Sequence, residues 1–338
     1  MGAASTFKYI LKRIVVSILI LFGVSIILYA LLRCMPTDFV EQRILALNQT
    51  GETVSQEFID QLYKTYGLSK ERTFSTIVGG YFTWLGNVFK GNFGNSFINQ
   101  RPVISEIFDP NRMGTSFFVA AISTVFEFLI AIPLGITAAT HQYSVRDYVV
   151  TVLVLIGISL PSFFFGNLLK DIFANKLGWF PPSGMGNAGM NYTPLQKAMD
   201  YMKHMFLPIL TVVILSIGGR MRMTRTNMLE VMNSDYIRTA RAKGLKEGKV
   251  IYKHAFRNTM IPLVTSLAGL IPSLFSGAMI TEQVFDLTGI GNYALKAMTQ
   301  GDIPVIMVYN MFLAILSVLG VLLADLMYAV VDPRVKLG

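Results

Sequence analysis

Charged residues are scarce in this sequence of 338 residues. Asp, Glu, Lys and Arg make up 14% of it, whereas a soluble domain carries about 25%. Hydrophobic residues make up 53%, and the mean hydropathy is +0.52. This composition excludes an ordinary soluble domain and predicts an integral membrane protein.

Thiol and imidazole groups are also few. The single cysteine, Cys34, excludes an intrachain disulfide framework and a thiolate metal cluster. The three histidines, at positions 141, 204 and 254, lie far apart and outside the clear apolar runs. The sequence therefore predicts no metal site, no cofactor and no histidine-based catalytic centre.

Nucleotide-binding and hydrolase motifs are missing as well. The nearest approach to a phosphate-binding loop, Gly244 to Lys249, has one residue too few between its glycines, and Val250 stands where Ser or Thr should bind magnesium. Neither a Gly-x-Ser-x-Gly nor a His-Glu-x-x-His pattern occurs. We expect no catalytic residue in this chain, so any transport driven by ATP must draw on another chain.

Long apolar runs are what the sequence does contain. They predict an all-α, polytopic membrane protein with six transmembrane helices, at about 14–32, 115–140, 148–169, 205–219, 259–281 and 303–328. The first run is 19 uncharged residues long and lacks a small-residue cleavage site, so we interpret it as a retained helix rather than a signal peptide. The fourth run is short for a span and must borrow its polar flanks.

The basic residues predict the orientation of these spans. The segments expected inside hold sixteen Lys and Arg, against four in the two short outer loops. By the positive-inside rule both termini are cytoplasmic. No internal repeat is evident, which weighs against a secondary transporter built from inverted repeats.

The spans divide the chain into three parts. Residues 1–32 form the N-terminal tail and first helix, 33–114 an external subdomain, and 115–338 a five-helix core with a cytoplasmic loop at 220–258. In the subdomain eight basic residues balance eight acidic ones. The stretch Thr53-Val-Ser-Gln56 predicts a capped helix start, followed until Gly67 by one apolar face. That face comprises Val54, Phe58, Leu62 and Tyr66.

Glu127 is the one charged residue of the second predicted span. A carboxylate there is costly unless it faces a wet cavity or a partner. We therefore predict that Glu127 faces a translocation pathway or another helix, and that Pro133 and Gly135 bend the span.

The loop at 220–258 is the most basic part of the chain. Ten Lys and Arg and three acids lie between Arg220 and Arg257. Within it, Tyr236, Ala240 and Gly244 recur at helical spacing, which predicts a short helix that ends at Gly244 and that another surface can approach closely. Composition alone also allows a juxtamembrane segment that sets topology or meets anionic lipid.

The order of residues in this loop resembles a known family. Asp235-Tyr-Ile-Arg-Thr-Ala-Arg-Ala-Lys-Gly244, followed by His254-Ala-Phe-Arg-Asn258 and Ile261-Pro262, is similar to the coupling loop of oligopeptide, dipeptide and nickel permeases of ABC importers. Arg238-Thr239-Ala240 stand where such loops commonly have Glu-Ala-Ala. The long external segment after the first helix resembles the permease subunit that carries one, as do 177–184, 282–291 and 325–334.

This resemblance implies a transport subunit rather than an enzyme, in a bacterial cell membrane. Its implied partners are a second, homologous permease, two ATP-binding subunits, an extracellular substrate-binding protein, a peptide substrate and membrane lipid, without nucleic acid. It implies that a short helix docks on an ATPase subunit. The residues so implied are Asp235, Tyr236, Arg238, Thr239, Ala240, Ala242, Lys243, Gly244 and Leu245.

The resemblance leaves peptides and nickel chelates open as substrates. A bare metal ion needs clustered imidazole, thiolate or carboxylate ligands, and the clear spans hold no histidine. Scattered Ser, Thr, Asn and small residues suit a roomy, wet passage for peptides better. A secondary transporter that needs no ATPase is the competing class, and an intramembrane enzyme a more distant one.

Overall fold

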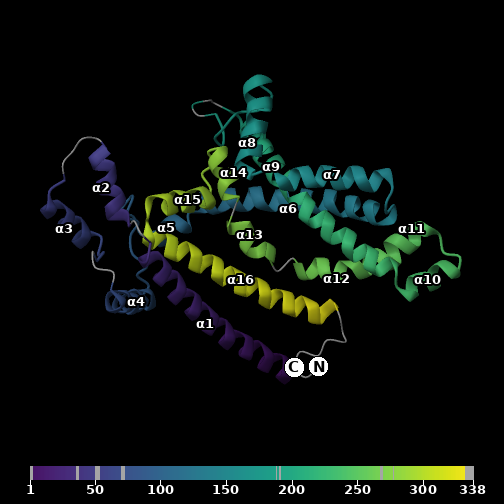
Figure 1. Ribbon diagram of the computed structural model, residues 1–338, viewed down its shortest axis with the longest axis horizontal. Coiled ribbons are helices and arrows are strands. Elements are labelled where there is room, and N and C mark those ends of the chain that lie inside the picture. Colours follow the sequence, from purple (N-terminus) through teal and green to yellow (C-terminus); the bar gives the residue numbers. More distant parts are fainter. Residues whose placement is uncertain are drawn as a thin grey trace. The chain divides into compact units, whose positions relative to one another are not determined.

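The computed structural model describes residues 3–35, 38–49, 54–69, 73–187, 189, 192–266, 269–276 and 278–331. Within these ranges the regular structure is helical, and one isolated antiparallel bridge joins Asn95 to Pro102. Figure 1 shows the helices in chain order, and the chain divides into two compact units.

The first unit takes in residues 1–113 and 293–318. Its core is aromatic: the buried rings of Tyr29, Tyr63 and Tyr81 pack with Met307. Tyr29 and Tyr81 meet edge to face at 5.6 Å, an arrangement that aromatic pairs favour. Its helices are α1 (Ala3–Arg33), α2 (Phe39–Gln49), α3 (Gln56–Thr65), α4 (Phe74–Phe89), α5 (Val103–Ile107), most of α15 (Ile290–Gln300) and the start of α16 (Ile303–Val331).

The second unit takes in residues 114–292 and 319–337. Its longest helix, α9 (Pro194–Met232), begins with a capping box between Thr193 and Gln196. The other elements are most of α6 (Pro110–Thr140), α7 (Val145–Ser159), α8 (Ser162–Leu169), η1 (Lys170–Lys176), α10 (Asp235–Ala242), α11 (Glu247–Lys249), η2 (Val250–Ala255), α12 (Phe256–Ser266), α13 (Leu270–Ser276) and α14 (Met279–Val284), where η marks a π-helix.

The six predicted spans are confirmed only in part. Among the described residues four continuous stretches are long and apolar enough to cross a membrane: 11–33, 103–140, 194–232 and 303–325. The third predicted span is two helices, α7 and α8, whose axes differ in direction by 103°. The break lies directly before α8, at Pro161, since proline disfavours helix at the residue that precedes it. The fifth is divided among α12, α13 and α14, so a count of six is not confirmed.

The short fourth run borrows its flanks as predicted. The 15 apolar residues lie inside the 39-residue helix α9, so the polar residues on both sides continue the same helix. Gly135, which was predicted to help bend the second span, has a packing role in the structure. A Cβ at Gly135 would stand 2.6 Å from the Cβ of Thr224, so this glycine lets α6 approach α9.

The capped helix predicted at Thr53 starts later than predicted. Thr53 lies outside the described residues, and the hydroxyl of Ser55 caps α3 by accepting a hydrogen bond from the Phe58 amide. Leu62 and Tyr66 of the predicted face pack against the core of the first unit, whereas Phe58 is 43% exposed and the buried residue of the helix is Tyr63. Gly67 follows the helix with φ +61°, which fits the predicted stop.

Candidate functional site

Helix α10 forms the short helix predicted in the basic loop. Ser234 precedes it, and the helix ends at Ala242. Gly244 follows with φ +75°, and its amide donates to the Arg241 carbonyl at 2.9 Å. A residue with a side chain rarely adopts this backbone conformation, so the structure confirms that Gly244 is where the helix stops.

One face of α10 packs against its own chain. Ile237 is fully buried and Ala240 is 7% exposed, and they share an apolar cluster with Ile136 of α6 and Met228 of α9. The predicted approachable face of Tyr236, Ala240 and Gly244 is therefore wrong at Ala240. A period of 3.6 residues fits several faces of so short a helix, and Ile237 is the apolar residue that selects the inner one.

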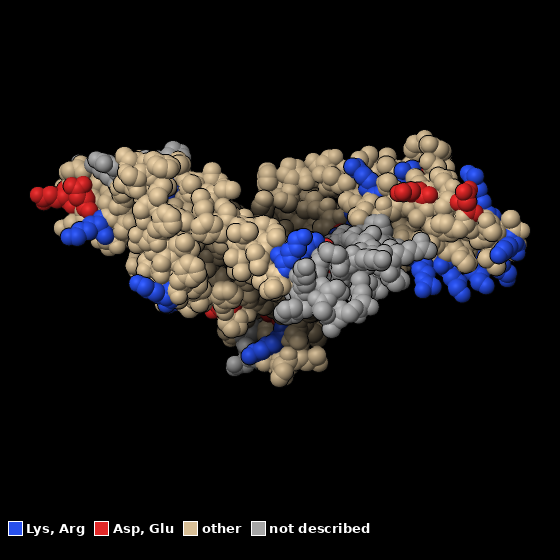
Figure 2. All heavy atoms as spheres, turned by 90° about the horizontal axis from the view of Figure 1, so that it is seen from below, with Lys and Arg blue, Asp and Glu red and all other residues tan. Residues whose placement is uncertain are grey.

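The opposite face of α10 is exposed and rich in polar side chains. The aromatic residue of this helix, Tyr236, is 46% exposed. Figure 2 shows blue Lys and Arg side chains gathered on the right of the view, the side on which Figure 1 draws α10 and α11. The predicted residues on this exposed surface are Asp235, Tyr236, Arg238, Thr239, Ala242, Lys243 and Gly244, and Leu245 is half-buried beside it. Their contact with another subunit stays a prediction.

An ion pair closes the turn after α10. Arg241 Nη2 lies 2.7 Å from Glu247 Oε1 of α11. The hydrogen bond from Arg241 lowers the pKa of Glu247. The contribution of the pair to folding stability is therefore present above the ordinary carboxyl pKa and is lost as pH falls through the lowered pKa. Both side chains are therefore charged in the neutral range, and because the pair is exposed its contribution to stability is small.

Glu127 has a helix partner rather than an open surface. Arg220 of α9 donates from Nε to its Oε1 at 3.0 Å, and the two side chains are 14% and 11% exposed. The Arg220 guanidinium also stacks on the Phe128 ring at 4.5 Å. The structure thus selects the helix-partner alternative for Glu127 and joins α6 to α9.

A second link between helices was not predicted from the sequence. Arg225 of α9 donates two hydrogen bonds to the Asp147 carboxylate of α7, at 3.0 and 2.9 Å. Asp147 is 5% exposed. The available signal was a pair of charges bordering apolar runs, but the sequence does not say which helices they join.

A buried carboxylate organises the turn after α14. Glu282 is fully buried and accepts hydrogen bonds from Ser116 Oγ at 2.6 Å and from the Asn292 amide at 2.8 Å. Ser116 Oγ in turn accepts from the Ile290 amide at 2.9 Å. A Cβ at Gly289 would collide with this carboxylate, so the glycines around Ile290 were the sequence signal for it.

A groove of about 420 Å³ lies between α8, α9, α13 and α14 of the second unit. Its lining surface is mostly apolar and its lining residues carry no charge, although Ser162, Ser216, Ser276 and Thr281 are among them. In the part of the chain that the structure describes, no three His, Cys, Asp or Glu side chains come together as metal ligands. The groove is therefore suited to an uncharged, largely apolar surface rather than to a bare cation.

Two family models match this chain. Residues 131–337 match the binding-protein-dependent transport system inner membrane component, and residues 6–120 match the N-terminal membrane component of the same systems. The oligopeptide transport system permease protein AppB of Bacillus subtilis is 35% identical over 328 residues, 97% of this chain and 99% of that protein. The dipeptide transport system permease protein DppB of Alkalihalophilus pseudofirmus is 32% identical, with the same coverage.

A solved structure of the MetNI methionine ABC transporter in an inward-facing conformation is also similar. It is 16% identical, covers 65% of this chain and 94% of its own, and has a TM-score of 0.49. That score is too low to establish a common fold.

Proposed function

Because this chain belongs to the binding-protein-dependent transport system inner membrane components, we propose that it carries short peptides across a bacterial cell membrane. It is a permease subunit and not an enzyme, and ATP hydrolysis belongs to separate subunits. Relatives that align along almost their whole length are named for oligopeptide and dipeptide transport. This end-to-end likeness supports peptides over nickel chelates.

The arrangement of α10 carries the mechanistic part of the proposal. Ile237 and Ala240 fix the helix to α6 and α9, while its other face is free to meet a partner. A push on that face would act directly on the spans beneath it. We infer that this surface docks on one of two ATP-binding subunits, in a complex with a second permease and an extracellular binding protein.

The groove between α8, α9, α13 and α14 is the part of the pathway that this chain supplies in our proposal. A largely apolar lining can contact peptide side chains of varied shape, and the absence of charge among the lining residues avoids a strong preference for side chains of one charge. Glu127 is assigned to helix pairing, since Arg220 already occupies its carboxylate.

Uptake by cells tests the substrate. A strain lacking this subunit is expected to lose uptake of short labelled peptides and to resist toxic peptide analogues, and restoring the wild-type chain should reverse both. Unchanged peptide uptake together with lost nickel uptake would overturn the proposal. Purification of the native complex, with its bound peptide identified by mass spectrometry, gives the length and sequence of the cargo.

A further inference from the structure

The first unit contains a cleft that none of the features above accounts for. It measures about 580 Å³ and lies among the end of α1, the helix α4, the turn at 92–100 and the start of α16. All of these segments belong to the one compact unit. A space of this size is comparable to sites that hold small ligands.

Aromatic rings form the wall of this cleft. Tyr29 and Trp84 lie 6.1 Å apart between ring centroids, and Tyr66 and Phe97 lie 5.1 Å apart. A Cβ at Gly80 would collide with the Tyr29 hydroxyl, so this glycine lets α4 approach α1. Such a wall can hold an apolar or aromatic side chain.

The cleft carries one positive charge that no carboxylate of its lining balances. Arg33 is a lining residue, and its Nε donates to the Tyr29 hydroxyl at 3.3 Å, while no carboxylate pairs with it among the residues that the structure describes. The Trp84 indole Nε1 is enclosed and has no hydrogen-bond partner there. The lining includes no Asp or Glu. A guanidinium makes its strongest hydrogen bonds to charged oxygen acceptors, and none lines the cleft, so Arg33 calls for an anionic oxygen ligand.

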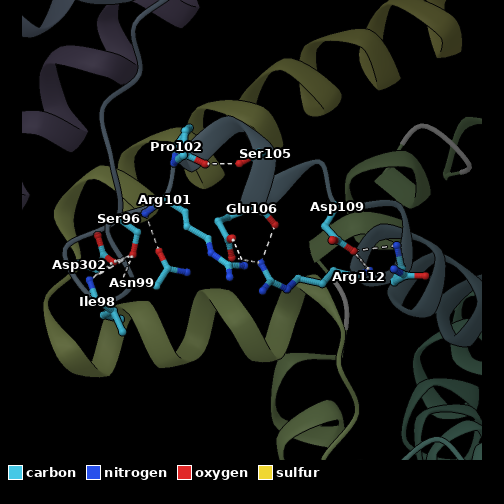
Figure 3. Close-up of polar contacts among 11 residues, drawn as sticks. Ser96, Ile98, Asn99, Arg101, Pro102, Ser105, Glu106, Asp109, Arg112 and Asp302 are labelled. Carbon is cyan, nitrogen blue, oxygen red and sulfur yellow. Dashed lines mark hydrogen bonds and ion pairs between the residues drawn. The ribbon is translucent and has the colours of Figure 1, made fainter.

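The polar side of the cleft is fixed before any ligand arrives. Ser96 Oγ donates to Asp302 Oδ2 at 2.6 Å, and the Ile98 amide donates to the same oxygen at 3.3 Å (Figure 3). Asp302 is fully buried. It thereby anchors the turn whose side-chain amides, those of Asn95 and Gln100, line the cleft.

We propose that this cleft binds the carboxyl-terminal end of a short peptide, a binding step on the external module that precedes passage through the membrane. The peptide carboxylate accepts hydrogen bonds from the Arg33 guanidinium, and its last side chain lies against the aromatic wall. The amides of Asn95 and Gln100 face the peptide backbone groups. This inference rests on the proposed function, because it takes the cargo to be a peptide. A lipid phosphate would also meet Arg33, but acyl chains need an apolar channel, whereas four side-chain amides line this cleft.

The chain offers its own reporter for a test. It contains two tryptophans, so Trp179→Phe leaves Trp84 as the single fluorophore. The full chain is placed in nanodiscs of phosphatidylcholine and titrated with the tripeptide Ala-Ala-Phe or with its carboxyl-terminal amide. The free acid is expected to change Trp84 fluorescence and to bind about tenfold more tightly than the amide, as a hydrogen bond to a charged group implies.

Arg33→Gln should weaken binding of the free acid about tenfold and leave the amide unchanged, so that the two peptides bind alike. The matched control is Arg43→Gln, an exposed arginine of the same unit that does not line this cleft, and it should bind as the parent does. The comparison of acid with amide leaves the protein unaltered, so a folding defect cannot imitate the result.

The proposal is overturned if acid and amide bind equally, if neither binds, or if Arg33→Gln behaves as Arg43→Gln does. A fluorescence change produced by phosphatidylglycerol without peptide would assign the cleft to lipid instead. Cellular uptake separates this inference from the proposed function. If the Arg33→Gln strain still takes up peptide although its cleft no longer binds it, only the role of the cleft in transport is refuted. If a strain lacking the whole chain still takes up peptide, the proposed function is refuted.

Discussion

Gly244 has a left-handed backbone conformation and open space around it. No atom lies within 4 Å of a Cβ placed there. Gly248, in the same loop, is equally open but lacks the left-handed conformation. Gly244→Trp is therefore expected to strain the helix end, by about 1–2 kcal/mol, and to abolish transport while membrane insertion is retained. Gly248→Trp adds the same bulk without that strain and should retain more transport. Wild-type substrate-stimulated ATPase activity in the Gly244→Trp complex would contradict the role given to this loop.

The pair of Glu127 and Arg220 predicts a stability effect. Glu127→Leu removes the carboxylate from a largely buried guanidinium, and breaking such a pair costs about 3–5 kcal/mol. We expect a lower melting temperature of the purified permease and less assembled complex. Glu127→Leu combined with Arg220→Met should recover most of the loss, since both charges are then gone.

Arg222→Met is the control for this pair, because Arg222 is exposed on the same helix. It should leave the melting temperature nearly unchanged. A Glu127→Leu permease that melts, assembles and transports like the wild type would show that the ion pair does not hold α6 to α9.

At the scale of elements, two serines of α6 allow a matched comparison. Ser116 and Ser123 are both buried, but Ser116 Oγ joins Glu282 to the turn after α14, whereas Ser123 Oγ has no hydrogen-bond partner among the described residues. Ser116→Ala leaves a buried carboxylate with one donor fewer, at a cost of about 1–3 kcal/mol. Ser123→Ala should be neutral or slightly stabilising, and thermal unfolding followed by tryptophan fluorescence compares the two. Equal melting temperatures would remove the role assigned to Ser116.

Periodicity and turn residues predicted where helices begin and end better than they predicted which helices pack together. The helix at α10 and its stop at Gly244 followed from spacing and from one glycine. The inner face did not, because a helix of two turns has too few apolar residues to define it. The bend between α7 and α8 was not predicted, because its size depends on the packing of α8 against α9 and α14, which no local pattern encodes.

At the scale of the whole molecule, labelling tests which side each loop occupies. Ser55 and Lys246 are both exposed, and the distribution of basic residues among the loops predicts that they lie on opposite sides of the membrane. Cysteines at these positions, introduced one at a time after exposed Cys34 has been replaced by serine, should differ in intact cells. An impermeant maleimide is expected to label residue 55 and to reach residue 246 only after the membrane is broken. Labelling of both in intact cells would refute the proposed topology.

Composition was enough to predict a helical membrane protein, and the order of residues in one loop was enough to predict its family. The contacts that hold the spans together were harder to predict, because they join residues far apart in the sequence. Glu127 was recognised as needing a partner, yet 93 positions separate it from Arg220. Many basic residues flank the spans, and only packing decides which one reaches a given acid.

That separation has a consequence for biogenesis. Ribosomes add about 5–20 residues per second, so α6 waits on the order of 5–20 s after Glu127 is made before Arg220 is synthesised. During this interval the nascent helix carries a carboxylate with no guanidinium to meet it. Release of α6 alone into lipid would be unfavourable, so the helix should remain beside the insertion machinery until α9 emerges, and the two helices should enter the bilayer together.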